Sequence, residues 1–90
     1  MTREEIRKKL AAWAVVALNV SEKKLVDDAD LSADLGADSL DLLELAMEIE
    51  EEFDVSVGDD EIESAKTFGA VVETIERLIS DQHASDRHRV

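Results

Sequence analysis

The sequence predicts an all-α fold: a small four-helix bundle of three longer helices, one short helix before the last, and a long loop between helices 1 and 2. Apolar residues recur at helical spacing in three separate stretches of the chain. The one stretch that alternates like a strand, residues 54–58, has no obvious second strand to pair with, and we interpret it as a loop. Ninety residues support a single small domain.

The first predicted helix begins with a capping box, formed by Thr2 as the cap and Glu5 three residues later. We expect the helix to run to about Leu18 and Asn19 to end it in a left-handed conformation. Residues at helical spacing mark its buried face: Ile6, Leu10, Trp13 and Ala17. We interpret Trp13 as a packing residue rather than a ligand contact.

The connection that follows, residues 20–37, is long for a compact domain. Spaced apolar residues among its acids are expected to anchor it: Val20, Leu25, Val26, Leu31 and Leu35. A short helical turn is expected at Ser21–Leu25 or Ser32–Leu35. Long anchored loops often carry function, and this one leads to Ser39.

The second predicted helix runs from Ser39 to about Phe53. Asp38 is its expected N-cap, because a carboxylate there accepts hydrogen bonds from N–H groups that the helix start leaves unpaired. The core face holds Leu42, Leu45, Ala46, Ile49 and Phe53. Three further apolar residues widen this face: Leu40, Leu43 and Met47. Either a second neighbouring helix covers them, or they form an apolar rim for a partner.

The remaining residues predict a short helix and a long one. Asp59 is the expected cap of the short helix, which ends at about Ser64 and follows a loop whose Val55 and Val57 point inward. Thr67 is the expected cap of the last helix. The apolar stripe of that helix is the most regular in the chain: Phe68, Val71, Val72, Ile75, Leu78 and Ile79.

We expect the domain to span residues 1–80 and the polar, aperiodic residues 81–90 to form a disordered tail. No metal site is predicted. His83 and His88 lie on that tail, where two ligands are poorly organised. The acids of residues 54–63 do not match the spacing of an EF-hand calcium loop.

Charge narrows the class of partner. The formal net charge is −13, and between Lys24 and Lys66 the chain has 16 acids and no base. This balance opposes binding to nucleic-acid phosphates or to an anionic membrane surface. It favours partners with basic surfaces, with solubility alone as the other explanation.

The chain has no cysteine, so it forms no disulfide or thiolate metal site, and any thiol chemistry needs an added group. No apolar run reaches the length that spans a bilayer, and the charged N-terminus lacks a signal-peptide pattern. We therefore expect a cytoplasmic protein, and nothing in the sequence requires more than a monomer.

Ser39 is the candidate functional residue. A glycine loop brings it to the first turn of a helix, where unpaired N–H groups and the helix dipole favour negative charge. A covalently attached phosphate suits that position. No Ser-His or Ser-Lys arrangement activates the hydroxyl as a nucleophile, so we do not expect an enzyme. An ordinary capping serine is the alternative.

These residues carry a resemblance. The run Gly36-Ala37-Asp38-Ser39-Leu40, followed by an acidic amphipathic helix, resembles the modification site of acyl carrier proteins of the bacterial fatty-acid type. The resemblance implies that Ser39 bears 4′-phosphopantetheine through a phosphodiester. The thiol of that arm would hold acyl chains as thioesters and present them to fatty-acid synthesis enzymes.

The resemblance also implies roles for other residues. Asp38 would lie near the metal used by the phosphopantetheinyl transferase that attaches the arm. Acids that match partner-binding positions are Asp41, Glu44, Glu50, Glu51, Asp59 and Asp60. Apolar positions at the partner surface or the acyl pocket are Leu40, Leu43, Met47, Val57 and Ile62. Gly58 stands where the family often has proline, which predicts a less rigid loop.

Two other functions remain open at this point. One is a specialised carrier for polyketide, aminoacyl or other acyl groups. The other is an unmodified acidic interaction module, for which Ser39→Ala would change nothing.

Overall fold

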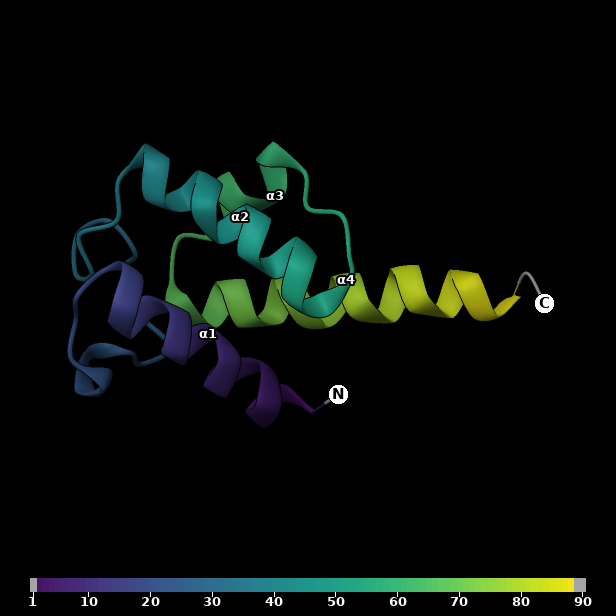
Figure 1. The fold of residues 1–90 in the computed structure, drawn as a ribbon, viewed down its shortest axis with the longest axis horizontal. Coiled ribbons are helices and arrows are strands. Elements are labelled where there is room, and N and C mark those ends of the chain that lie inside the picture. The colour runs from purple at the N-terminus through teal and green to yellow at the C-terminus, as the bar shows by residue number, and fades with distance from the viewer. Residues whose placement is uncertain (1, 89–90) are drawn as a thin grey trace.

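The computed structural model describes the backbone of residues 2–88 and the side chains as far as Gln82. The described chain is helical, apart from turns and an isolated antiparallel bridge between Asp30 and Thr67. The predicted all-α fold with a long first loop is confirmed (Figure 1). Its elements are α1 (Arg3–Ala17), the 3₁₀ turn η1 (Glu22–Lys24), α2 (Ser39–Phe53), α3 (Asp59–Ser64) and α4 (Phe68–His88).

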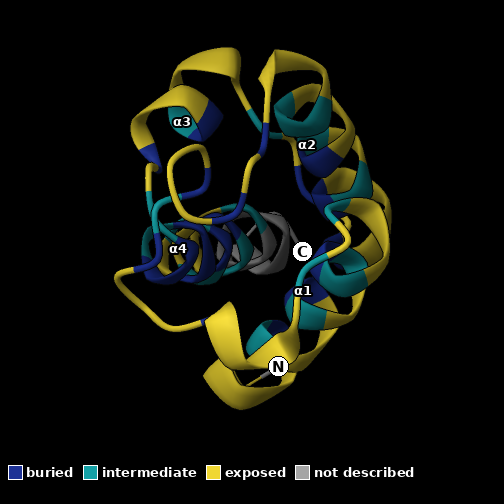
Figure 2. Cartoon of the chain, turned by 90° about the vertical axis from the view of Figure 1, so that its left-hand side faces the viewer, coloured by how far each residue is buried: buried dark blue, intermediate teal, exposed yellow. Residues whose placement is uncertain are grey.

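The longest helix, α4, extends along the long axis of the molecule, and its last turns project beyond the other helices (Figure 1). Viewed nearly along α4, the buried segments of α1, α2 and α4 face a common centre (Figure 2). The most deeply buried large side chains are Phe68, Ile6, Leu45, Ile49, Ile75, Val71 and Val72. Burying each such side chain stabilises the fold by about 1.5–3 kcal/mol before the cost of ordering the chain.

The start of α1 confirms the predicted capping box. The Glu5 N–H donates to Thr2 Oγ1 over 3.2 Å, and the Thr2 N–H donates to Glu5 Oε1 over 2.9 Å. The predicted buried face was partly wrong, because α1 buries Ala14, leaves Trp13 half-buried and exposes Ala17. The buried residues follow an i, i+4 row, which is inclined to the helix axis, as expected where a helix crosses its neighbours at an angle.

The long loop is anchored where the sequence predicted, with two exceptions. Leu25, Leu31 and Leu35 are buried, and η1 confirms a helical turn within Ser21–Leu25. Val20 is only half-buried, and Val26 is exposed, so its prediction as an anchor was wrong. The side chain of Leu25 points into the core, whereas that of its neighbour Val26 points to solvent.

Arg7 on α1 holds the first part of this loop. Its guanidinium pairs with the Asp27 carboxylate, donates to the Leu25 carbonyl over 3.2 Å and lies 5.1 Å from the centroid of the Phe68 ring. The Phe68 and Gly69 N–H groups, at the start of α4, donate to the carbonyls of Ala29 and Asp27, each over 2.9 Å. The loop therefore connects α1 to α4.

The beginnings of α3 and α4 differ. Gly58, not Asp59, is the N-cap residue of α3, and it makes no side-chain cap bond, so the predicted Asp59 cap was wrong. Asp59 already has helical conformation and occupies the first turn. Thr67 caps α4 as predicted, because its Oγ1 accepts the Ala70 N–H over 3.1 Å.

The helix α4 continues past residue 80 to His88. Gln82 gives a physical reason for the first part of this continuation. Its Nε2 donates to the Ser56 carbonyl over 3.0 Å and its Oε1 accepts the Ser56 N–H over 2.9 Å. The side chains of 83–88, including both histidines, and all of residues 89–90 lie outside the described residues. The division at residue 80 stays a prediction.

None of the helices in the described part of the chain is both long and apolar enough to cross a membrane. The cytoplasmic location stays a prediction from the sequence.

Candidate functional site

The glycine loop before α2 is fixed on both sides of its turn. Gly36 has φ +72°, a left-handed conformation that glycine adopts without a steric penalty. Its neighbours Leu35 and Ala37 are buried, and the Ala37 N–H donates to the Leu31 carbonyl over 2.8 Å. The turn therefore delivers Asp38 and Ser39 to a defined place at the start of α2.

Asp38 caps α2, as the sequence predicted. Its Oδ1 accepts the Asp41 N–H over 2.9 Å, and Asp41 Oδ2 accepts the Asp38 N–H over 3.1 Å, which completes a reciprocal capping box. The part played by Asp41 was missed from the sequence, where the spacing Asp-x-x-Asp was its only signal. The capping box pairs the Asp41 N–H at the start of α2. The N–H groups of Ser39 and Leu40 have no acceptor among the described residues.

Ser39 is the first residue of α2 and is exposed. Its hydroxyl makes no hydrogen bond with any described residue, so neither a base nor a capping bond occupies it. The unpaired N–H groups beside it and the positive end of the α2 dipole favour an anion at this place. The site suits attachment of a phosphate-linked group and lacks the base of a serine nucleophile.

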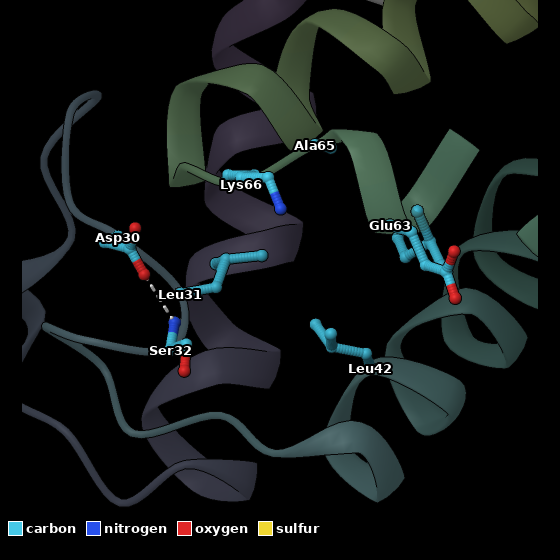
Figure 3. Close-up of a pocket in the computed structure, with 8 residues that line it drawn as sticks. Asp30, Leu31, Ser32, Leu42, Glu63, Ala65 and Lys66 are labelled. Carbon is cyan, nitrogen blue, oxygen red and sulfur yellow. Dashed lines mark hydrogen bonds between the residues drawn. The ribbon is translucent and has the colours of Figure 1, made fainter. Parts of the chain in front are cut away.

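Ser39 also borders a cavity of about 270 Å³ between α2 and α3. Its lining residues are Ser39, Leu42, Leu43, Ala46, Asp59, Ile62 and Glu63. A second cavity, of about 210 Å³, lies between α2, α3 and the long loop (Figure 3). Its lining residues are Asp30, Leu31, Ser32, Leu42, Ile62, Glu63, Ala65 and Lys66.

The apolar candidates divide into surface and interior. Leu40, Leu43 and Met47 are 64%, 56% and 62% exposed, so no second helix in the described part of the chain covers them. Val57 is half-buried. Ile62 is buried and forms part of both cavity walls, a position that fits a pocket residue rather than a surface contact.

The six acidic candidates have different surroundings. Glu50 Oε2 accepts the Val57 N–H over 2.9 Å and so supports the loop after α2, while Asp41 belongs to the capping box. The other four are exposed and make no ion pair among the described residues: Glu44, Glu51, Asp59 and Asp60. These four are free to meet a basic partner.

Comparison with known proteins agrees with this geometry. The family model described as the phosphopantetheine attachment site matches residues 8–75, which defines a phosphopantetheine-binding class of protein. The acyl carrier protein of Thermotoga maritima is 43% identical over 78 residues, covering 87% of this chain and 96% of that protein. The acyl carrier protein of Porphyromonas gingivalis is 42% identical over 73 residues, covering 81% and 94% respectively.

A solved structure supports the same assignment. The acyl carrier protein from Enterococcus faecalis superposes with a TM-score of 0.77 at 32% identity, covering 87% of this chain and 99% of that one. The chain belongs to the acyl carrier protein family. It carries acyl groups on a covalently attached 4′-phosphopantetheine and is a carrier rather than a catalyst.

Proposed function

We propose that Ser39 is the residue that bears the phosphopantetheine and that the loaded protein serves fatty-acid synthesis enzymes. The observation that carries this proposal is the exposed Ser39 hydroxyl, unbonded within the described chain, at a helix start with two N–H groups unpaired. These residues fit a phosphodiester, because the N–H groups and the helix dipole stabilise its negative charge. When bound, the arm supplies the thiol that the chain lacks, and that thiol holds the acyl group as a thioester.

The residues of the chain position this attachment point. The Asp38–Asp41 box fixes where α2 begins, and the turn at Gly36 sets the direction from which the chain enters the helix. Asp38 uses Oδ1 in the box, which leaves Oδ2 without a hydrogen bond among the described residues. That oxygen is available to the metal of the transferase during attachment.

Proteins of this family interact with acyl chains and with the enzymes that transfer them. We propose that this chain meets those enzymes through the exposed rim of Leu40, Leu43 and Met47. Four exposed acids of α2 and α3 would steer partners with basic surfaces toward this rim: Glu44, Glu51, Asp59 and Asp60.

Intact mass spectrometry tests the attachment site. The apo protein, Ser39→Ala and Ser56→Ala are each incubated with coenzyme A, Mg²⁺ and a broad-specificity phosphopantetheinyl transferase. Ser56 is a matched control, since it is also exposed. We expect one phosphopantetheine on the parent and on Ser56→Ala, and none on Ser39→Ala. A gain by Ser39→Ala, or no gain by the folded parent, would overturn the proposal.

The same holo protein tests the pathway. Incubation with a fatty-acid loading enzyme should give the acyl thioester, whereas acceptance only by polyketide or aminoacyl loading enzymes would assign a specialised carrier instead.

A further inference from the structure

A groove of about 460 Å³ lies between α1 and α2. Its lining residues are Lys9, Ala12, Trp13, Val16, Ala17, Glu48 and Glu52. None of them lines the cavity that borders Ser39, and none belongs to the exposed rim of α2. The groove is therefore a surface feature separate from the candidate attachment site.

The wall that α1 contributes to this groove is largely apolar. Val16 is 83% exposed, the largest exposed fraction of any large apolar side chain in the described part of the chain. Trp13, one turn earlier, is half-buried and packs partly against the core, and the neighbouring Ala12 and Ala17 are exposed. A single exposed apolar residue is ordinary on a protein surface, whereas a contiguous apolar strip that includes tryptophan is typical of a binding surface.

The wall that α2 contributes is acidic, and its two carboxylates have different surroundings. Glu52 Oε1 accepts from Lys9 Nζ over 2.6 Å, the only ion pair between α1 and α2 among the described residues. Glu48, one turn before Glu52, is half-buried and makes neither an ion pair nor a side-chain hydrogen bond within the described chain. A carboxylate that has lost part of its hydration gains from a charge-assisted hydrogen bond. The groove thus offers a place for one positive charge beside an apolar strip.

The dimensions and charge of the groove favour one kind of occupant. From Lys9 to Ala17, α1 rises by about 12 Å, or about two helical turns. An amphipathic helix in the groove would place apolar side chains at i, i+3 or i+4, and i+7 against this strip. An arginine at its flank could pair with Glu48 and also stack on the Trp13 ring. A second copy of this chain is opposed by the net charge of −13 that it would bring.

We propose that the groove between α1 and α2 is a docking site for an amphipathic helix of a partner protein, whose apolar side chains cover Trp13 and Val16 and whose arginine pairs with Glu48. Docking there uses no residue of the rim and leaves Ser39 accessible. The carrier can therefore be held by one protein while its arm is presented to another. Only this last consequence rests on the proposed attachment at Ser39.

Fluorescence tests the docking site directly, because Trp13 is the only tryptophan in the chain. The probe is a synthetic amphipathic helical peptide with leucine at i, i+3, i+4 and i+7, one arginine beside that face and no aromatic residue. Titration into the parent should shift the Trp13 emission to shorter wavelength and saturate, because the peptide removes water from the ring. No saturable change would overturn the proposal.

Substitutions at exposed positions locate the bound peptide. Val16→Ser should raise the Kd about threefold to tenfold, since apolar contact is lost. Glu48→Gln should raise it about twofold to fivefold, as expected for a partly exposed ion pair. The matched controls are Val26→Ser and Glu73→Gln, at exposed positions outside the groove, and they should leave the Kd unchanged. Equal weakening by the controls would show that the peptide binds without preference for the groove.

A second peptide, with glutamine in place of its arginine, tests the pairing with Glu48. If the arginine pairs with this carboxylate, Glu48→Gln weakens binding of the arginine peptide and leaves binding of the glutamine peptide unchanged. Equal weakening of both peptides would overturn the pairing.

Two further measurements separate the remaining outcomes. Sedimentation velocity of the parent alone should give a monomer, and a dimer that Val16→Ser abolishes would assign the groove to contacts between copies and overturn the proposal. Phosphopantetheine loading, followed by intact mass, should proceed equally with and without saturating peptide. A block of loading by the peptide would contradict access to Ser39 during docking, whereas failure of the peptide-free parent to load would count only against attachment at Ser39.

Discussion

The loop segment around Asp27 is tied to α1 and α4 by directed contacts, whereas α3 is held mainly by the burial of Ile62 and Ala65. Arg7 alone makes an ion pair, a hydrogen bond and a ring contact in the first region. In the second region, α3 has no side-chain cap and one exposed ion pair to α4. Hydrogen bonds constrain both the distance and the angle between two groups, whereas apolar burial is non-directional.

The difference matches what each region does. The Asp27 segment carries no candidate functional residue and keeps α1, the loop and α4 in register. The α2–α3 region contains Ser39, the exposed rim and both cavity walls. The directed contacts are thus concentrated away from the candidate site, and mutations in the two regions should have unequal effects.

Gly69→Ala, at the contact between α4 and the Asp27 segment, should be the most destabilising change. A Cβ at this buried position would lie 2.9 Å from both the backbone oxygen and the Cβ of Asp27. Backbone atoms cannot move aside as a flexible side chain can, so we expect a loss of about 1–3 kcal/mol in the free energy of unfolding. Urea denaturation measures it, and a loss within experimental error would show that the loop is not tightly docked.

Arg7→Ala should cause the next largest loss in the free energy of unfolding, and this loss should exceed that of Arg77→Ala. The substitution removes the ion pair with Asp27, the hydrogen bond to the Leu25 carbonyl and the contact with the Phe68 ring. Together these contacts should contribute roughly 1–2 kcal/mol after allowance for solvent screening. Arg77 loses one exposed pair with Glu61, about 0–1 kcal/mol. Equal losses in urea denaturation would remove the distinction between the two regions.

Glu44→Lys tests the proposed partner-binding face of α2 against an exposed position on α4. We expect association with the transferase to slow by about threefold to tenfold at low ionic strength, because steering toward the rim is reversed. Glu73→Lys, at an exposed position on α4, makes the same change in net charge and should have a smaller effect. Stopped-flow measurement of the association rates at two salt concentrations tests this. Equal slowing by Glu44→Lys and Glu73→Lys would indicate that only the net charge of the protein affects association.

Gly58→Pro should stabilise the α2–α3 region. The φ of −75° suits proline, and the Gly58 N–H donates no hydrogen bond among the described residues. Reduced freedom of the unfolded chain should add about 0.4–1 kcal/mol to the free energy of unfolding. Thermal and urea unfolding measure the change, and destabilisation would show that Val57 cannot adopt the backbone that proline requires of its predecessor.

Glu5→Gln should give the smallest loss in the free energy of unfolding, and this loss should depend on pH. The backbone N–H of Thr2, followed by its hydroxyl, lowers the pKa of Glu5 below the ordinary value of 4.5. A carboxyl with a lowered folded-state pKa stabilises the fold above its ordinary pKa and loses this contribution as pH falls through the folded value. The free energy of unfolding of Glu5→Gln should therefore be lower than that of the parent at neutral pH, and this difference should disappear on acidification.

Glu4→Gln is the control, since the side chain of Glu4 makes no hydrogen bond among the described residues. If Glu5→Gln remains less stable than the parent at low pH, the stabilisation at this cap comes from the geometry of the side chain and not from its charge.

Local interactions explain why the sequence predicted most helices and the position of Ser39 at the start of one of them. Helical periodicity, the Thr2–Glu5 and Asp38 caps, and the left-handed Asn19 all depend on residues a few positions apart. Ser39 at a helix start after Gly36 is also a local arrangement. These features were therefore available from the sequence alone.

Tertiary structure decided the features that join distant segments. The crossing of α1 over its neighbours selected Ala14 for burial instead of Ala17, and the Gln82–Ser56 hydrogen bonds join α4 to the loop after α2. The placement of Ile62 between two cavities depends on how α3 meets α2 and the loop. Such choices follow from packing angles and long-range hydrogen bonds, which residue spacing does not specify.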